Sequence, residues 1–266
     1  LYDVFGTGQR KRDNHNSYGA GFVTQQDRFA IGFTEQDLAN NVGEFLSPDA
    51  DEAELWSKFS FCSTNQWSFE RARRELGALD LQKSTRKCLY RPFDYRYTVF
   101  NRNVCTIGRE RITSQFYSGK NLGLLTTRRV TRLPYNNAFV ATECAEYKVA
   151  SHDRNTIVFP LWVDDKDSPA AGELFKESRR ANINPGFAIT LKKGLQLAED
   201  ALPESIFAYV YAILHSPAYR DRYGEFLKID FSGDINPTVS SHKFIYDHKF
   251  FPNIQINYTE NILNKM

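Results

Sequence analysis

The sequence predicts a mixed α/β fold, in which a small twisted sheet carries peripheral helices and an antiparallel helix pair follows near the C-terminus. Three observations lead to this prediction. Strand-like runs occur in the middle of the chain, helical periods occur on both sides of them, and no segment repeats along the 266 residues. With 41% hydrophobic and 25% charged residues, the composition is that of a globular protein with a sizeable core.

The region 34–89 is predicted to be mainly helical. Thr34 precedes an acidic turn and an apolar face, which is typical of a capped helix. Shorter helices are expected over 51–57 and 68–76. Upstream, polar residues interrupt two strand-like runs, and Thr24, Asp27 and Arg28 are expected in a short loop between them.

The region 90–163 is predicted to be a sheet-rich basic core. Residues 95–100 alternate with a period of two, which is the pattern of a half-exposed strand. Further strands are expected over 122–127, 139–142 and 156–163. The last of these contains the apolar run IVFPLWV, which is typical of a buried strand.

The C-terminal third divides into three parts. An exposed insertion is expected over 164–202, because small, acidic and basic residues follow one another there without a period. Two helices with broad apolar faces form the pair expected over 203–229. The last part, 232–266, shows no clear period and is treated as an atypical segment outside the domain 1–231.

Positive charge gathers in the middle of the chain. Although the net charge is only +2, residues 71–132 hold 15 Lys or Arg against four Asp or Glu, so the flanks are acidic. A basic surface of this kind is the electrostatic footprint of a polyanion-binding protein. We expect it to consist of Arg96, Arg102, Arg109, Arg111, Lys120, Arg128, Arg129 and Arg132.

Cysteine usage and hydropathy favour an intracellular protein. The four cysteines are widely spaced, with no CxxC pair and no histidines at zinc-finger spacing, which predicts reduced thiols and no bound metal. No apolar run is long enough to span a membrane and no signal peptide is recognisable, so a cytoplasmic location without membrane contact is expected. Because the sequence begins at Leu1, we also expect it to be a piece of a longer polypeptide.

Two other functions remain open at this point. Glu146 and Lys148 fit half of a metal-dependent nuclease motif, and Asp94 could supply the upstream acid. Alternatively, the apolar helix pair over 203–229 could serve a protein-interaction module. That second alternative leaves the surplus of arginine unexplained.

Five blocks in a fixed order carry a resemblance to a known family. They are TQQDRFAI, KCLYRPFDYRYTVF, GKNLGLLTTRR, IVFPLWV and IFAYVYAILHSPAYRDRYGEFLKIDF. In this order they resemble the C-terminal target-recognition region of type ISP and type IIG restriction-modification enzymes. After Lys228 the chain departs from the Pro-Arg-Ile-Pro-like motif of that family, which is why 232–266 is set apart.

The resemblance implies sequence-specific recognition of double-stranded DNA. It implies an adenine-specific methyltransferase domain upstream in the same polypeptide, which would use S-adenosylmethionine, with Mg²⁺ and ATP serving nuclease and ATPase domains where present. No cofactor and no catalytic residue are expected in this chain. The loop of Thr24, Asp27 and Arg28 would lie near the methyltransferase and the bases, unless Asp27 acts only as a structural cap.

Overall fold

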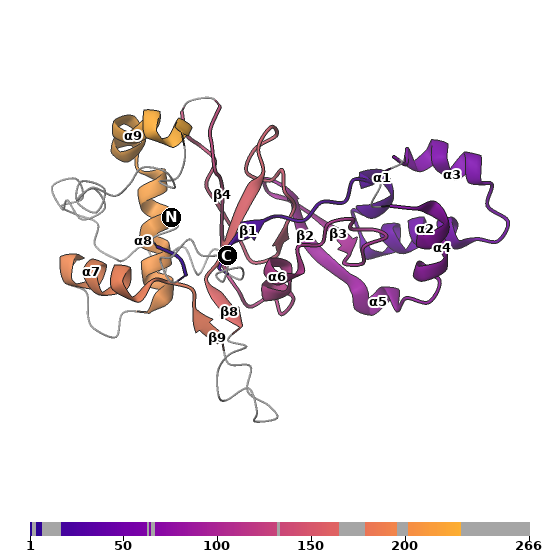
Figure 1. Ribbon diagram of the computed structural model, residues 1–266, viewed down its shortest axis with the longest axis horizontal. Coiled ribbons are helices and arrows are strands. Elements are labelled where there is room, and N and C mark those ends of the chain that lie inside the picture. The colour runs from indigo at the N-terminus through magenta and orange to yellow at the C-terminus, as the bar shows by residue number, and fades with distance from the viewer. Residues whose placement is uncertain are drawn as a thin grey trace, which may run out of the picture.

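A computed structural model describes residues 1, 4–6, 17–62, 64, 67–131, 134–164, 179–195 and 202–229. The fold is mixed α/β as predicted, with helices at both ends of an elongated molecule and short strands between them (Figure 1). In place of the single sheet that we expected, the described strands form three small sheets. The atypical segment 232–266 lies outside the described residues.

One end of the molecule is built from short helices. They are α1 (Asp27–Ala30), α2 (Glu35–Leu46), α3 (Glu52–Phe59), α4 (Phe69–Leu76) and α5 (Leu81–Ser84). The predicted cap at Thr34 is confirmed, because its hydroxyl accepts a hydrogen bond from the Asp37 amide at 3.1 Å. In return, the Asp37 carboxylate accepts one from the Thr34 amide at 2.9 Å. This reciprocal pair satisfies two amides that the helix leaves free and sets its start at Glu35.

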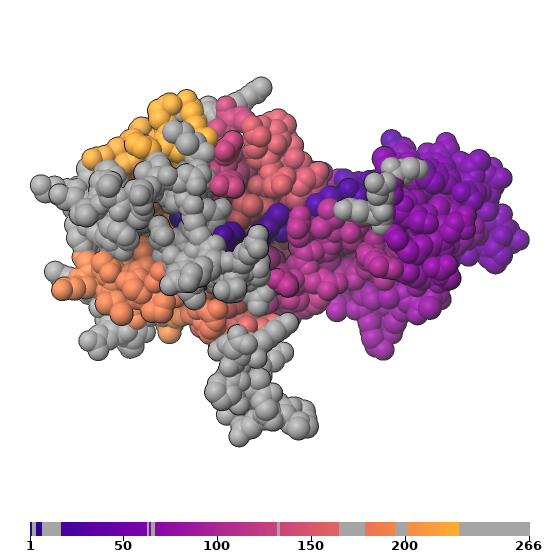
Figure 2. Space-filling model, viewed as in Figure 1, coloured from indigo at the N-terminus to yellow at the C-terminus, as the bar shows by residue number. Residues whose placement is uncertain are grey.

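Aromatic rings fill the core of this helical end. The Phe29 ring lies against Phe45, Phe59 and Phe61, with centroids 5.0, 5.3 and 5.4 Å away. The Trp67 indole donates a hydrogen bond to the backbone oxygen of Asn103 at 2.8 Å, which ties this core to the loop after the central hairpin. Figure 2 shows the helices as a rounded lobe at one side of the molecule.

The central hairpin belongs to a three-stranded sheet with the order β3-β2-β6. Its strands are β2 (Thr85–Arg91), β3 (Asp94–Val99) and β6 (Cys144–Ala145). Strands β2 and β3 are antiparallel and joined by the two-residue turn Pro92–Phe93, whereas β6 runs parallel to β2. Strand β3 was expected from its period, but β2 was not, because we placed residues up to 89 in the mainly helical region and read those before Pro92 only as an extended entry to β3.

A four-stranded antiparallel sheet has the order β1-β7-β4-β5. Its strands are β1 (Gly19–Ala20), β7 (Thr156–Pro160), β4 (Gly123–Thr127) and β5 (Phe139–Ala141). All five residues of β4 are buried, because the strand is paired on both sides. Between the two sheets, the helical turns α6 (Glu110–Thr113) and η1 (Ser114–Phe116) connect β3 to β4.

The strand expected over 156–163 is divided in two. It breaks at Leu161, whose side chain is fully buried, and continues as β8 (Trp162–Asp164) in a third sheet. There β8 pairs with β9 (Arg179–Ala181). Leu161 joins the two sheets, because its amide donates to the Leu122 carbonyl and its own carbonyl accepts from the Asn182 amide, both at 2.7 Å.

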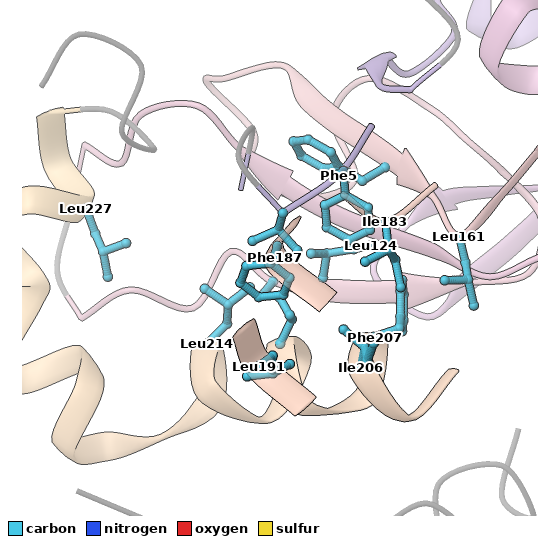
Figure 3. Close-up of a cluster of buried hydrophobic side chains, with 14 of the residues drawn as sticks. Phe5, Leu124, Leu161, Ile183, Phe187, Leu191, Ile206, Phe207, Leu214 and Leu227 are labelled. Atoms are coloured by element: carbon cyan, nitrogen blue, oxygen red, sulfur yellow. The ribbon is translucent and has the colours of Figure 1, made fainter. Parts of the chain in front are cut away.

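The other end of the molecule holds α7 (Pro185–Leu195), α8 (Pro203–His215) and α9 (Pro217–Ile229). Figure 3 shows side chains of α7 and α8, among them Phe187 and Phe207, gathered against Phe5 and Leu124 in the main core. The stretch expected to be an exposed insertion therefore contributes core residues. The expected helix pair is present, but only Ser216 separates its helices, and α9 lies across the end of α8 instead of antiparallel to it (Figure 1).

The four cysteines are free thiols, and Cys88, Cys105 and Cys144 are buried. Burial raises the pKa of each of these three thiols, so they remain protonated at neutral pH. Within the described part of the chain, no helix is long and apolar enough to cross a membrane.

Candidate nucleic-acid interface

The β2–β3 hairpin holds an arginine in a fixed position. Asp94 and Arg96 lie two residues apart on β3 and therefore project from the same face of the strand. The Arg96 guanidinium donates to both carboxylate oxygens of Asp94, at 2.5 and 2.9 Å, and this pairing raises its pKa. The central carbon of the Arg96 guanidinium also lies 3.3 Å from the centroid of the Phe33 ring. Arg96 is thus held both by charge and by stacking.

Beside the hairpin lies an open hollow of about 350 Å³. Four parts of the chain line it, namely the segment 23–28, the end of α3 at Phe59 and Ser60, Arg91 of β2, and residues 146–148. The backbone at Glu146 is held there because its amide donates to the Leu89 carbonyl of β2 at 2.9 Å. Residues far apart in the sequence thus meet around one hollow.

Glu146 is the buried acid of this hollow. Its side chain is only 1% exposed and accepts hydrogen bonds from Arg91 Nη1 at 2.7 Å and from the Lys148 amide at 2.6 Å. Burial raises the pKa of Glu146 to about 7, because the lowering by these partners does not offset the loss of hydration. At neutral pH the carboxyl is therefore partly protonated.

Asp27 is the second acid, and it has structural partners. Its carboxylate accepts hydrogen bonds from the Tyr90 hydroxyl, at 2.6 Å, and from the buried hydroxyl of Thr24. Arg91 Nη2 lies 3.8 Å from Asp27 Oδ2, so this arginine stands between two carboxylates. Its guanidinium also stacks on Tyr90, 3.8 Å from the ring centroid. Burial, and then the bond to Asp27, raise the pKa of Tyr90 and keep its proton in place.

The segment before Asp27 differs from the expected loop between strands, because Asp27 begins the helix α1. Gln25, two residues before Asp27, has a φ of 61°, a left-handed conformation that is uncommon for a residue with a side chain. Gln25 is exposed and lines the hollow, whereas the buried Gln26 bonds the backbone of Cys62 through both ends of its amide. Arg28, also exposed, donates to Ser60 Oγ at 2.7 Å.

The other predicted cations occupy several places. Arg102 forms an ion pair with Glu75 at 2.9 Å, and Arg128 is exposed. Arg132 lies outside the described residues. Four exposed cations form no ion pair with any described residue, namely Arg109, Arg111, Lys120 and Arg129. Lys120 and Arg129 flank opposite ends of β4, whereas Arg109 and Arg111 lie at the start of α6, so the basic residues do not form a single cluster.

The geometry does not assemble the nuclease site that we considered. Asp94 is held by Arg96 and Glu146 by Arg91, while the Lys148 ammonium lies over the Tyr147 ring, 4.7 Å from its centroid. Among the residues that the structure describes, no group of three or more His, Cys, Asp or Glu could hold a metal ion. The apolar face of α8 is buried in the main core and is not available for the protein-interaction alternative, whereas Phe226 of α9 is exposed.

Comparison with known proteins decides the family. Residues 15–232 match the family described as Type ISP C-terminal specificity domain. The chain belongs to this family. The five blocks whose order resembled the target-recognition region lie within the matched residues, so the resemblance is confirmed. A comparison with curated proteins finds no match.

Solved structures share the fold of this specificity domain. A DrdV–DNA complex aligns with a TM-score of 0.59 at 21% identity, over 80% of this chain and 20% of that one. The ATP-dependent Type ISP restriction-modification enzyme LlaBIII, bound to DNA, aligns with 0.60 at 13% identity, over 86% and 15%. A nuclease-deletion mutant of the Type ISP enzyme LlaGI, with a DNA substrate mimic, aligns with 0.53 at 18% identity, over 84% and 21%. The chain thus spans about a fifth or less of each.

Arg91 is the residue of the specificity domain that sequence reasoning missed. It links Asp27 to Glu146, and without it the two acids would face each other across the hollow with no cation between them. Its signal in the sequence is weak, because Arg91 precedes Pro92 in a strand that we did not predict. Tyr90, which orients both Asp27 and Arg91, was missed for the same reason.

Proposed function

We propose that this specificity domain recognises a sequence in double-stranded DNA for a restriction-modification enzyme. The observation that carries the proposal is the family match over 15–232. Methyl transfer with S-adenosylmethionine would belong to an upstream domain of the same polypeptide, as would any use of Mg²⁺ or ATP. The chain itself would contribute affinity and sequence preference, in the cytoplasm where its DNA is found.

The division between paired and unpaired cations supports two kinds of DNA contact. Arg109, Arg111, Lys120 and Arg129 are exposed and carry no ion pair among the described residues, so their charge is available to phosphates. Phosphate contacts supply affinity without sequence information. Arg96 and Arg102 already have acidic partners and would give less to a phosphate, because binding it means sharing or losing the pair.

The hollow is the better place for reading bases. A base edge is distinguished by its pattern of donors and acceptors, and the hollow offers both from fixed positions. Asp27 can accept hydrogen bonds, while Lys148 and Arg28 can donate them. The amide of Gln25 can do both, and its side chain extends from a constrained backbone.

The test is a change of sequence preference in the full-length enzyme. A duplex is first selected from a randomised pool by its binding, and each base pair of the selected site is then varied. Gln25→Ala should relax the preference at one base pair by about tenfold or more, the range for a bidentate side-chain contact. Gln82→Ala, which removes an exposed amide on α5, is the matched control and should leave every position unchanged.

Two results would contradict the proposal at different levels. Equal binding of the enzyme to all duplexes, or no binding, would exclude sequence recognition by this domain. Sequence-dependent binding that Gln25→Ala leaves intact at every base pair would preserve DNA recognition and move the reading site away from the hollow.

A further inference from the structure

Phe93 is both strained and exposed. It occupies the second position of the Pro92–Phe93 turn with a φ of 63°, where glycine or asparagine is the usual residue. Its side chain is 86% exposed, the highest value among the exposed large hydrophobic residues. So exposed a ring buries little apolar surface and contributes little to folding. An observed backbone outlier of this kind is a reason to look for a function.

The turn presents the ring from a rigid base. Pro92 fixes its own φ, and the strands on either side are paired up to Arg91 and Asp94. The ring packs against Phe139 of β5 in a T-shaped arrangement, with centroids 6.1 Å apart and planes at 74°. Phe33 is the next most exposed phenylalanine, but the Arg96 guanidinium covers the face of its ring.

The surroundings of Phe93 favour a polyanion over an apolar protein surface. Arg91 and Arg96 lie within three residues of Phe93, although both are paired with carboxylates. Arg86 and Lys87 lie at the far end of β2, and Asp94 is the single acid of the hairpin. Arg91 also lines the hollow, and it lies two residues before Phe93. Proteins that bend or open DNA insert apolar side chains between base pairs while cations hold the flanking phosphates. An exposed aromatic ring at the end of a basic hairpin has this combination.

We propose that Phe93 is a wedge that stacks on a base at a step opened in the bound duplex, next to the hollow. This inference rests on the proposed function, because it needs DNA at the hairpin. It adds that the domain distorts the DNA that it reads. Part of the sequence preference would then come from how easily the step opens, and not from contacts to its base edges.

The experiment uses the full-length enzyme and a duplex selected from a randomised pool, with 2-aminopurine placed at successive positions of the site. Wild type should raise the fluorescence of the probe at one step, because unstacking relieves its quenching. Phe93→Gly should abolish this signal and weaken binding about tenfold, the scale of one lost stacking contact. An abasic site at that step should restore most of the affinity, since the step is then already open.

Glycine is the informative substitution because it also removes the backbone strain. The thermal midpoint of Phe93→Gly should equal or exceed that of wild type, so a loss of the signal cannot be ascribed to unfolding. Phe226→Ala, which removes an exposed ring on α9, is the matched control and should retain the fluorescence change. An unchanged signal in Phe93→Gly, with normal DNA binding, would overturn the wedge and leave the proposed function standing. Absence of duplex binding by wild type would overturn both.

Discussion

At the scale of single residues, Glu146 shows how burial governs a charge. Its carboxylate has a cation and a backbone amide as partners, yet its pKa is raised to about 7 from the ordinary value of 4.5. The folded protein therefore holds a proton on Glu146 that the unfolded chain releases at lower pH. Arg91 and Asp27 face the same carboxyl, where the arginine lowers the pKa of Glu146 and the aspartate raises it.

This difference predicts a pH dependence of stability. Because the folded pKa is the higher one, the contribution of Glu146 is fully present below about pH 4.5 and is lost as the pH rises toward 7. The loss should reach about 3 kcal/mol by the linkage relation. Glu146→Gln should remove this slope, so its free energy of unfolding should fall less than that of wild type between pH 5 and 7. Urea denaturation at several pH values measures the free energy of unfolding of wild type and of Glu146→Gln.

Glu143 provides the control for that measurement. Burial raises its pKa as well, but it lies outside the hollow and has no arginine partner among the described residues. The free energy of unfolding of Glu143→Gln should therefore fall with rising pH nearly as steeply as that of wild type, because both proteins retain Glu146. If the free energies of unfolding of Glu146→Gln and wild type changed equally from pH 5 to 7, the raised pKa of Glu146 would be wrong.

At the scale of elements, local signals were sufficient where one face of an element decides its position. Helix α2 was predicted from its cap and its period, and β3 from its alternation. Strand β2 was missed because Cys88 and Leu89 are adjacent and both lie in a core cluster, so no alternation appears along it. The break at Leu161 was missed because an apolar run looks the same whether or not it changes sheets.

The site was harder to predict than the fold for the same physical reason. The bond between Arg91 and Glu146 joins residues 55 positions apart, and no local period reports such a contact. Sequence identified Thr24, Asp27 and Arg28 as a group, and the structure places all three at or beside the hollow. Their contact with DNA stays a prediction, as does that of the basic residues along β4.

Two glycines, one inside helix α2 and one before it, offer a test of stability. Gly43 lies inside the helix, and a Cβ added there meets no atom within 4 Å. Gly43→Ala should therefore raise the free energy of unfolding by roughly 0.5 to 1 kcal/mol, because alanine loses less backbone entropy in a helix. Gly32→Ala is the opposite case, since its Cβ would lie 2.7 Å from the Thr34 carbonyl oxygen. Equal effects of the two substitutions in urea denaturation would contradict this account.

At the scale of the whole molecule, the sheets lie between two helical ends (Figure 1), and two of the exposed cations flank the strand β4. Lys120 and Arg129 flank the five residues of β4, which span roughly 17 Å at the usual rise per residue. That length corresponds to about half a turn of B-form DNA. A duplex that contacts both ends of β4 would therefore lie along the strand and bring its central bases toward the middle of the molecule.

The salt dependence of DNA binding tests this arrangement. Each phosphate that a protein cation neutralises contributes about −0.9 to the slope of log K against log salt. Replacing Arg109, Arg111, Lys120 and Arg129 together by alanine should reduce the slope of the full-length enzyme by about three to four, if each binds one phosphate. Arg102→Ala should change it less, because Glu75 already neutralises that guanidinium. If the variant with all four substitutions kept the wild-type slope, the DNA would not follow β4.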